Sequence, residues 1–196
     1  MQPGYDLRIF TMIKALTDTV LPAVDSGNRA AVEQLHLVIG SLKLLRDQID
    51  YAHWFEVADA RSIVTLIGQL AAEVDLPAVR TAQGRAVDLL AIAERHDVPL
   101  TTIRDANAEL RSAIRTIIED AQASSDASDR RCVQSLVLAH SEAQITRERA
   151  FIAATGFDVF PDTLQSIEES LLAAGTVQMA AAAALEKRST ETIWRT

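Results

Sequence analysis

The segment RAAVEQLHLVIGSLKLLRDQID, residues 29–50, carries apolar side chains on two sides of a helix. Side chains that recur at three- and four-residue spacing share one face of an α-helix. The longer row consists of Ala31, Leu35, Val38, Leu42, Leu45 and Ile49, and a second row holds Leu37 and Leu44. Because both rows need a covering, we expect this helix to be either the central helix of a bundle or one that also meets another subunit.

The same spacing continues along the chain, with almost no two-residue alternation and only seven glycines and five prolines to interrupt it. Further helices are predicted over residues 52–74, from Pro77 to about Arg95, over 103–121 and over 130–154. A C-terminal helix from Asp162, rich in alanine over residues 180–184, has a weak point at Gly175. We therefore predict an all-α fold, a single domain of residues 1–196 built as a bundle of about six to eight helices, including long antiparallel ones.

Composition restricts the kinds of partner. The chain is 48% hydrophobic and 23% charged, which suits one globular core, and its net charge of −8 argues against general binding to nucleic acids or anionic lipids. The uncharged stretch 174–185 is shorter than the roughly 20 residues that cross a bilayer. The first residues lack the layout of a signal peptide. We expect a cytoplasmic protein with no membrane or nucleic-acid partner.

Polar side chains interrupt the apolar stripe of residues 130–154. His140, Gln144 and Arg147 all project within about 60° of Val133 and Phe151. In one interpretation His140 is a core histidine with one hydrogen bond, and Arg147 pairs with a carboxylate across the bundle. In the other they line a ligand pocket, where histidine is a base or ligand and arginine binds a carboxylate or phosphate.

His53 and Glu56 pose the same question near the start of their helix. A glutamate on an apolar face must be paired or exposed. Either the first turn protrudes and leaves Glu56 in water near the positive helix end, or His53 and Glu56 share the pocket of His140. Two groups of aromatic residues can close an end of the core or line the mouth of such a pocket; they are Tyr51, Trp54 and Phe55, and Phe151, Phe157 and Phe160.

Metal binding has two short candidate motifs, Glu33-Gln-Leu-His36 and Asp50-Tyr-Ala-His53. In ferritin-like bundles such pairs lie on two core helices, with single glutamates from two others. Here Glu33 and His36 fall mostly opposite the main apolar row, and the second motif follows almost at once. We therefore predict no metal and no cofactor, with Glu33, His36, Asp50 and His53 as weak candidates and Glu142 and Glu148 as possible supplementary ligands.

Residues 90–110 resemble the helix-turn-helix of bacterial regulators, with Ala93, Val98 and Ile103 at its small and apolar positions. The resemblance implies that the helix beginning near Thr101 reads DNA. Asp97 replaces the usual turn glycine, however, and the recognition segment balances two arginines against two acids. An ordinary helix connection fits these residues better.

Other catalytic signatures are missing from the sequence. It contains no Gly-x-Gly or Gly-Lys-Ser/Thr phosphate loop and no Gly-x-Ser-x-Gly elbow. Cys132, the one cysteine, is expected to be a small buried hydrophobe.

We expect a non-catalytic protein that acts by self-association, or by binding a protein or small ligand. The homo-oligomer would form through residues 29–50 or the alanine-rich C-terminal helix. The alternatives are an enzyme or ligand-binding bundle with a polar pocket of His53, Glu56, His140, Gln144 and Arg147, a ferritin-like metal bundle and a DNA-binding regulator. Whether the chain is an enzyme stays open.

Overall fold

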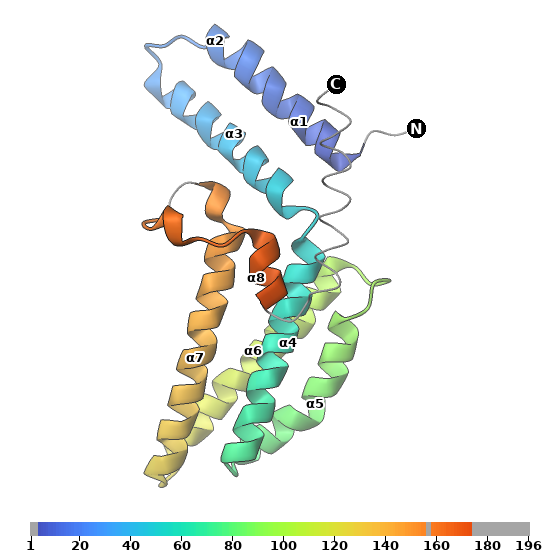
Figure 1. Cartoon of the computed structure of the whole chain (residues 1–196), viewed down its shortest axis with the longest axis vertical. Helices are drawn as coiled ribbons and strands as arrows, with labels where there is room; N and C mark the ends of the chain where they lie inside the picture. Colours follow the sequence, from blue (N-terminus) through green and yellow to red (C-terminus); the bar gives the residue numbers. More distant parts are fainter. Residues whose placement is uncertain (1–3, 156–157, 174–196) are drawn as a thin grey trace.

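The computed structural model describes residues 4–155 and 158–173, and these residues form helices joined by short turns (Figure 1). No strand occurs among them, which confirms the all-α prediction. No helix in this part of the chain has both the length and the apolar character to cross a membrane. Phe157, Gly175 and the alanine-rich C-terminal segment lie outside the described residues.

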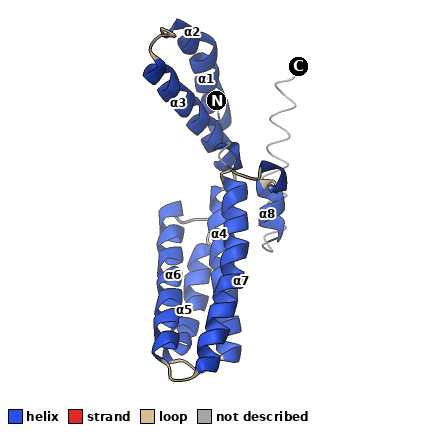
Figure 2. Cartoon of the chain, turned by 90° about the vertical axis from the view of Figure 1, so that its left-hand side faces the viewer, coloured by secondary structure: helices blue, strands red, loops and turns tan. Residues whose placement is uncertain are grey.

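Four long helices pack together as a bundle, α4 (Ala52–Glu73), α5 (Pro77–Ala93), α6 (Leu100–Ala123) and α7 (Ala127–Phe151) (Figures 1 and 2). Helices α5 and α6 run antiparallel along their whole length. The Ala78 amide, at the start of α5, donates to Asp120 Oδ2 near the end of α6 at 3.0 Å, and Arg85 pairs with Glu109 at 2.6 Å nearer the other end. Short connections are enough for such neighbours.

Helix α4 is the central helix, because it packs against α5, α6 and α7. Its buried apolar side chains are at most 2% exposed, and they are Val57, Ala58, Ala60, Ile63, Leu66, Ile67 and Leu70. The prediction that residues 29–50 supply the central helix is therefore wrong. Periodicity shows which sides of a helix are apolar, but it does not show how many neighbours the helix has.

The N-terminal residues form a separate two-helix hairpin that stands away from the bundle in both views (Figures 1 and 2). It consists of α1 (Tyr5–Ala15), a π-helical turn (Leu16–Val20), α2 (Leu21–Ala23) and α3 (Arg29–Gln48), and the Asn28 side chain caps α3 by accepting a hydrogen bond from the Ala31 amide. Arg46 pairs with Asp6 at 2.6 Å between the antiparallel helices. Within α1 and α3 only Ile9 and Ile39 are buried.

A turn at Ile49–Tyr51 separates α3 from α4, so the junction near Tyr51 is a break rather than a kink. Two short turns, Ala153–Thr155 and Pro161–Thr163, and the helix α8 (Ile167–Ala173) cover this end of the bundle. The two aromatic groups meet here, because Phe55 stacks on Phe151 with ring centroids 4.2 Å apart. The buried Tyr51 donates from its hydroxyl to Glu168 at 2.9 Å.

Removal of a core side chain from α4 should destabilise the protein far more than removal of a hairpin side chain. We expect Leu66→Ala to lower the free energy of unfolding by about 3 kcal/mol, since Leu66 is 1% exposed and a cavity would remain. The control Leu45→Ala removes a side chain that is 46% exposed, and its effect should stay below about 1 kcal/mol. Urea titrations measure both; equal losses would contradict this division of the molecule.

Candidate functional site

The five predicted pocket residues are not all neighbours: Glu56, His140 and Arg147 each interact electrostatically with Asp59, whereas His53 contacts His96 and Gln144 contacts Glu148. They divide among contacts of α4 with α6, contacts of α4 with α7, and the turn between α5 and α6. Gln144 is the exception, because its side chain donates to Glu148 at 2.9 Å along α7 itself. The remaining four are described in turn.

Glu56 is paired with helix α6. Arg104 Nε donates to Glu56 Oε1 at 2.8 Å, and Asn107 Nδ2 donates to both Glu56 Oε2 and the Glu56 carbonyl at 2.9 Å. Asn107 is fully buried, and its Oδ1 has no hydrogen-bond partner. Because the Glu56 side chain is only 12% exposed, the predicted protrusion into water does not occur.

One turn further along α4, Asp59 lies between two arginines and is only 3% exposed. Arg111 of α6 donates a short hydrogen bond to its carboxylate, and Arg147 Nη2 of α7 lies 3.8 Å from Asp59 Oδ1. Burial raises the pKa of the Asp59 carboxyl, while the charges of Arg111 and Arg147 act in the opposite direction. Asp59 was not identified from the sequence as a site residue. The only indication in the sequence is its position between two alanines, three residues after Glu56.

His140 and Arg147 occupy the interface of α7 with α4. His140 Nδ1 lies 3.2 Å from the Ser62 hydroxyl, and burial followed by the charge of Arg147 lowers the pKa of His140. Arg147 is 8% exposed, its Nη2 makes no hydrogen bond with any residue that the structure describes, and burial lowers its pKa as well. These contacts match the interpretation of a core histidine with one hydrogen bond and an arginine paired with a carboxylate across the bundle.

His53 lies away from these residues, beside the turn that joins α5 to α6. Its ring centroid is 5.3 Å from that of His96 and 4.6 Å from that of Trp54. His53 Nε2 is buried without a hydrogen-bond partner, and burial, followed by the charge of His96, lowers the pKa of His53. The cluster closes the end of the bundle where α4 begins.

The four weak metal candidates are also dispersed. Glu33 and His36 line a cleft of about 440 Å³ between α3 and the turn at Ala153–Thr155, Asp50 is exposed in the turn after α3, and His53 faces His96. In the described ranges, 4–155 and 158–173, no three His, Cys, Asp or Glu side chains gather as a metal site would require.

The segment that resembles a helix-turn-helix forms part of the bundle. Two helices of that motif cross at roughly 90–120°, whereas α5 and α6 are antiparallel. Ala93 and Ile103 are fully buried in the core, and Arg104 is engaged by Glu56. The connection is therefore that of an ordinary antiparallel helix pair.

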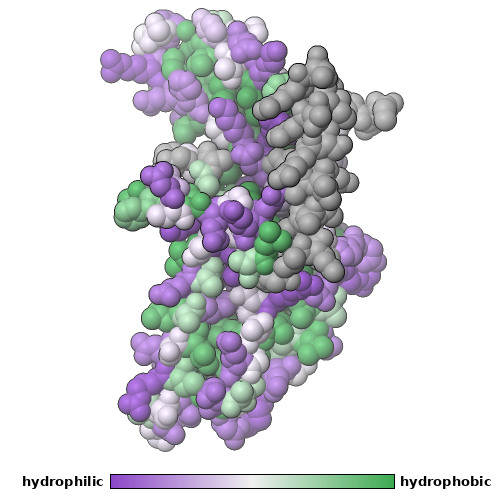
Figure 3. Space-filling view, viewed as in Figure 1, coloured by the Kyte–Doolittle hydropathy of each residue, from purple (hydrophilic) through white to green (hydrophobic). Residues whose placement is uncertain are grey.

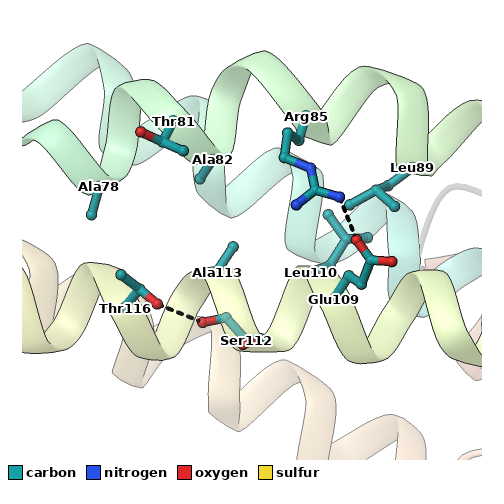
Figure 4. Close-up of a pocket in the computed structure, with 10 residues that line it drawn as sticks. All are labelled: Ala78, Thr81, Ala82, Arg85, Leu89, Glu109, Leu110, Ser112, Ala113 and Thr116. Atoms are coloured by element: carbon teal, nitrogen blue, oxygen red, sulfur yellow. Dashed lines mark hydrogen bonds and ion pairs between the residues drawn. The ribbon is translucent and has the colours of Figure 1, made fainter.

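A cleft of about 300 Å³ separates α5 from α6, and small side chains form most of its walls (Figure 4). Its two charged residues, Arg85 and Glu109, neutralise each other across the cleft. Thr81 and Thr116 donate their hydroxyl hydrogens to carbonyls of their own helices, Pro77 O and Ser112 O. Most of the charged and hydroxyl groups that line this cleft are therefore already engaged within the protein.

Four exposed apolar side chains of the hairpin form a set that we call the hairpin face: Tyr5, Met12, Val38 and Leu45. Their exposed fractions are 72%, 46%, 48% and 46%, and Val38 and Leu45 are seven residues apart on one side of α3. A cleft of about 620 Å³ lies along this face, and Arg8 is the one charged residue that lines it. Figure 3 shows apolar surface on the hairpin, at the top of the view.

Comparisons with known proteins give no relative for this chain. No protein-family model matches it, and neither a curated protein nor a solved structure is significantly similar. Its function has to be inferred from the arrangement of its own residues.

Loss of the Asp59 charge should destabilise the protein more than loss of the Arg147 charge. Asp59→Asn leaves Arg147 buried without its carboxylate, which should cost about 3 kcal/mol. Arg147→Met leaves Asp59 paired with Arg111, so about 1 kcal/mol is expected. Denaturant titrations at neutral pH give both values, and the reverse order would show that Arg147 does not depend on Asp59.

His140 should make the fold less stable in acid. A histidine whose folded pKa lies below its usual 6.5 binds a proton more readily when unfolded, so stability falls as the pH drops through about 6.5. In His140→Gln this contribution is absent. We expect the loss of unfolding free energy between about pH 7.5 and pH 5.5 to be smaller in the variant than in the wild type. An identical loss of unfolding free energy in the variant and the wild type would contradict a lowered pKa of His140 in the folded protein.

Proposed function

We propose that this chain is a cytoplasmic, non-catalytic protein that works by self-association, and that the hairpin face is its interface. The observation that carries the proposal is the exposure of four large apolar side chains on a two-helix unit that buries only Ile9 and Ile39 between its helices. Contiguous apolar surface of this kind is typical of interaction sites.

The chemistry of the face favours a second copy of the same chain as its partner. Gln34, one turn before Val38 on this side of α3, is exposed and uncharged. Interface cores are depleted in charge, and a two-fold symmetric dimer brings the same patch of both subunits together. Apart from Arg8, which lines the cleft, the hairpin face itself is uncharged, although the whole chain has a net charge of −8.

The expected affinity is modest. Complete burial of a large apolar side chain contributes about 1.5–3 kcal/mol, so burial of the exposed half gives about 1 kcal/mol each. The four residues of the face, contributed twice in a symmetric dimer, supply roughly 8 kcal/mol, and association costs at least about 4 kcal/mol. We therefore expect a reversible dimer that forms as the protein concentration rises.

The polar contacts inside the bundle support a structural role for the predicted pocket. Glu56, Asp59 and His140 each use their side chain on a neighbouring helix. Buried polar pairs of this kind can fix the register between helices. Catalysis by these residues is therefore not part of the proposal.

A charge on the hairpin face should abolish the dimer. Leu45→Arg places a cation in the middle of the apolar interface of both copies. Sedimentation equilibrium should then give the monomer mass of 21.3 kDa at all concentrations, whereas the wild type approaches twice that mass when concentrated.

The matched control is Val87→Arg, which adds the same charge at a residue of α5 that is 69% exposed and outside the hairpin. Its mass should follow that of the wild type. The proposal fails if the wild type stays monomeric at high concentration, or if both arginine variants dissociate alike.

A further inference from the structure

A second apolar cleft, of about 500 Å³, lies between the end of α6 and the start of α7, and we call it the distal groove. It is at the end of the bundle opposite the hairpin (Figure 1). Ala121 and Val133, which are 2% and 3% exposed, are its most buried lining residues, and Leu138 is 62% exposed. The groove has the size of a typical small-molecule site, about 300–1,000 Å³.

The charge of the distal groove is opposite to that of the protein as a whole. Arg130 and Arg131 are its only charged lining residues, in a chain with a net charge of −8. Arg130 donates to the Ser124 carbonyl, whereas Arg131 is exposed and makes no ion pair or hydrogen bond with any residue the structure describes.

Among the residues that the structure describes, no carboxylate forms an ion pair with Arg131, and two of the acidic side chains near the groove accept hydrogen bonds from backbone amides. Asp120 accepts a hydrogen bond from the Ala78 amide at 3.0 Å, and Asp126 accepts one from the Ser128 amide at 2.6 Å, where it caps α7. The amide side chains of Gln122 and Gln134 also line the groove and can donate hydrogen bonds. Donors and a cation thus border an otherwise apolar surface.

We propose that the distal groove binds a small amphiphile with a carboxylate head and an alkyl chain, that is, a fatty acid. Arginine binds a carboxylate through two parallel hydrogen bonds, so Arg131 would hold the head group. The alkyl chain lies against Ile118, Val133 and Val137, where each covered methylene leaves water. The α5/α6 cleft lacks this combination, because its one arginine is paired with Glu109.

The test is a titration of the isotope-labelled full chain with sodium dodecanoate below its micelle concentration, followed by amide chemical shifts. We expect saturable binding of one dodecanoate per chain, with shifts concentrated in residues 118–122 and 127–138. Sodium butyrate has the head without the long chain and should not bind measurably. Dodecyltrimethylammonium has the chain with a cationic head and should bind at least about fivefold more weakly.

Two arginine variants make the test specific. Arg131→Gln should weaken dodecanoate binding about fivefold, as expected for loss of a partly exposed charged hydrogen bond. Arg115→Gln removes the same charge from an exposed position of α6 outside the groove, and affinity should stay within about twofold. Leu45→Arg should bind dodecanoate like the wild type, which separates this site from the hairpin face.

Three results would overturn the proposal. The first is equal affinity of the wild type and Arg131→Gln for dodecanoate, and the second is chemical shift changes centred on α1 and α3. In the third, the variant Leu138→Glu forms a smaller oligomer than the wild type but binds dodecanoate as well as the wild type does. The groove would then be an interface between copies of this chain.

Discussion

The burial of α4 among α5, α6 and α7 is the constraint on which the rest of the structure depends. On the sides of α4 that its neighbours cover, a polar side chain needs a partner in place of water. Glu56, Asp59 and Ser62, at three-residue spacing, lie on the side that meets α6 and α7, and each finds a partner there: Asn107, Arg111 and His140. These pairs determine how α6 and α7 are placed along α4.

Among the residues that the structure describes, none covers the hairpin in this way. Helix α3 has apolar side chains on two sides, as α4 does, yet within the chain it packs mainly on α1 and on the turn at Ala153–Thr155. Gln48 holds its end to the bundle by donating to the Phe151 carbonyl at 2.8 Å. The apolar side chains left exposed are those that we assign to self-association, so the bundle is the scaffold and the hairpin is the interacting part.

The sequence predicts the positions of the helices better than it predicts which helices pack against each other. Periodicity located the long helices, and the interpretation in which His140 makes one hydrogen bond and Arg147 pairs with a carboxylate agrees with their contacts, although Ser62 and Asp59 were not identified as the partners. It could not show that α4 is central, because a single chain carries no information on which apolar faces meet. Asp59 was missed for the same reason: between Ala58 and Ala60 it resembles an exposed acid until α6 and α7 are placed around it. Glu33 and His36 had the form of a motif, but in the described part of the chain no third possible metal ligand gathers with them.

The most direct test of the account is backbone hydrogen exchange of the wild-type chain, measured at low and at high protein concentration. If a second copy covers the hairpin, amides of α1 and α3 should exchange more slowly in the concentrated sample, because association adds to the stability of the elements it covers. Amides of α4 to α7, which are covered within one chain, should exchange alike in both samples. Exchange in α1 and α3 that does not depend on concentration would contradict the assignment of the hairpin as the interface.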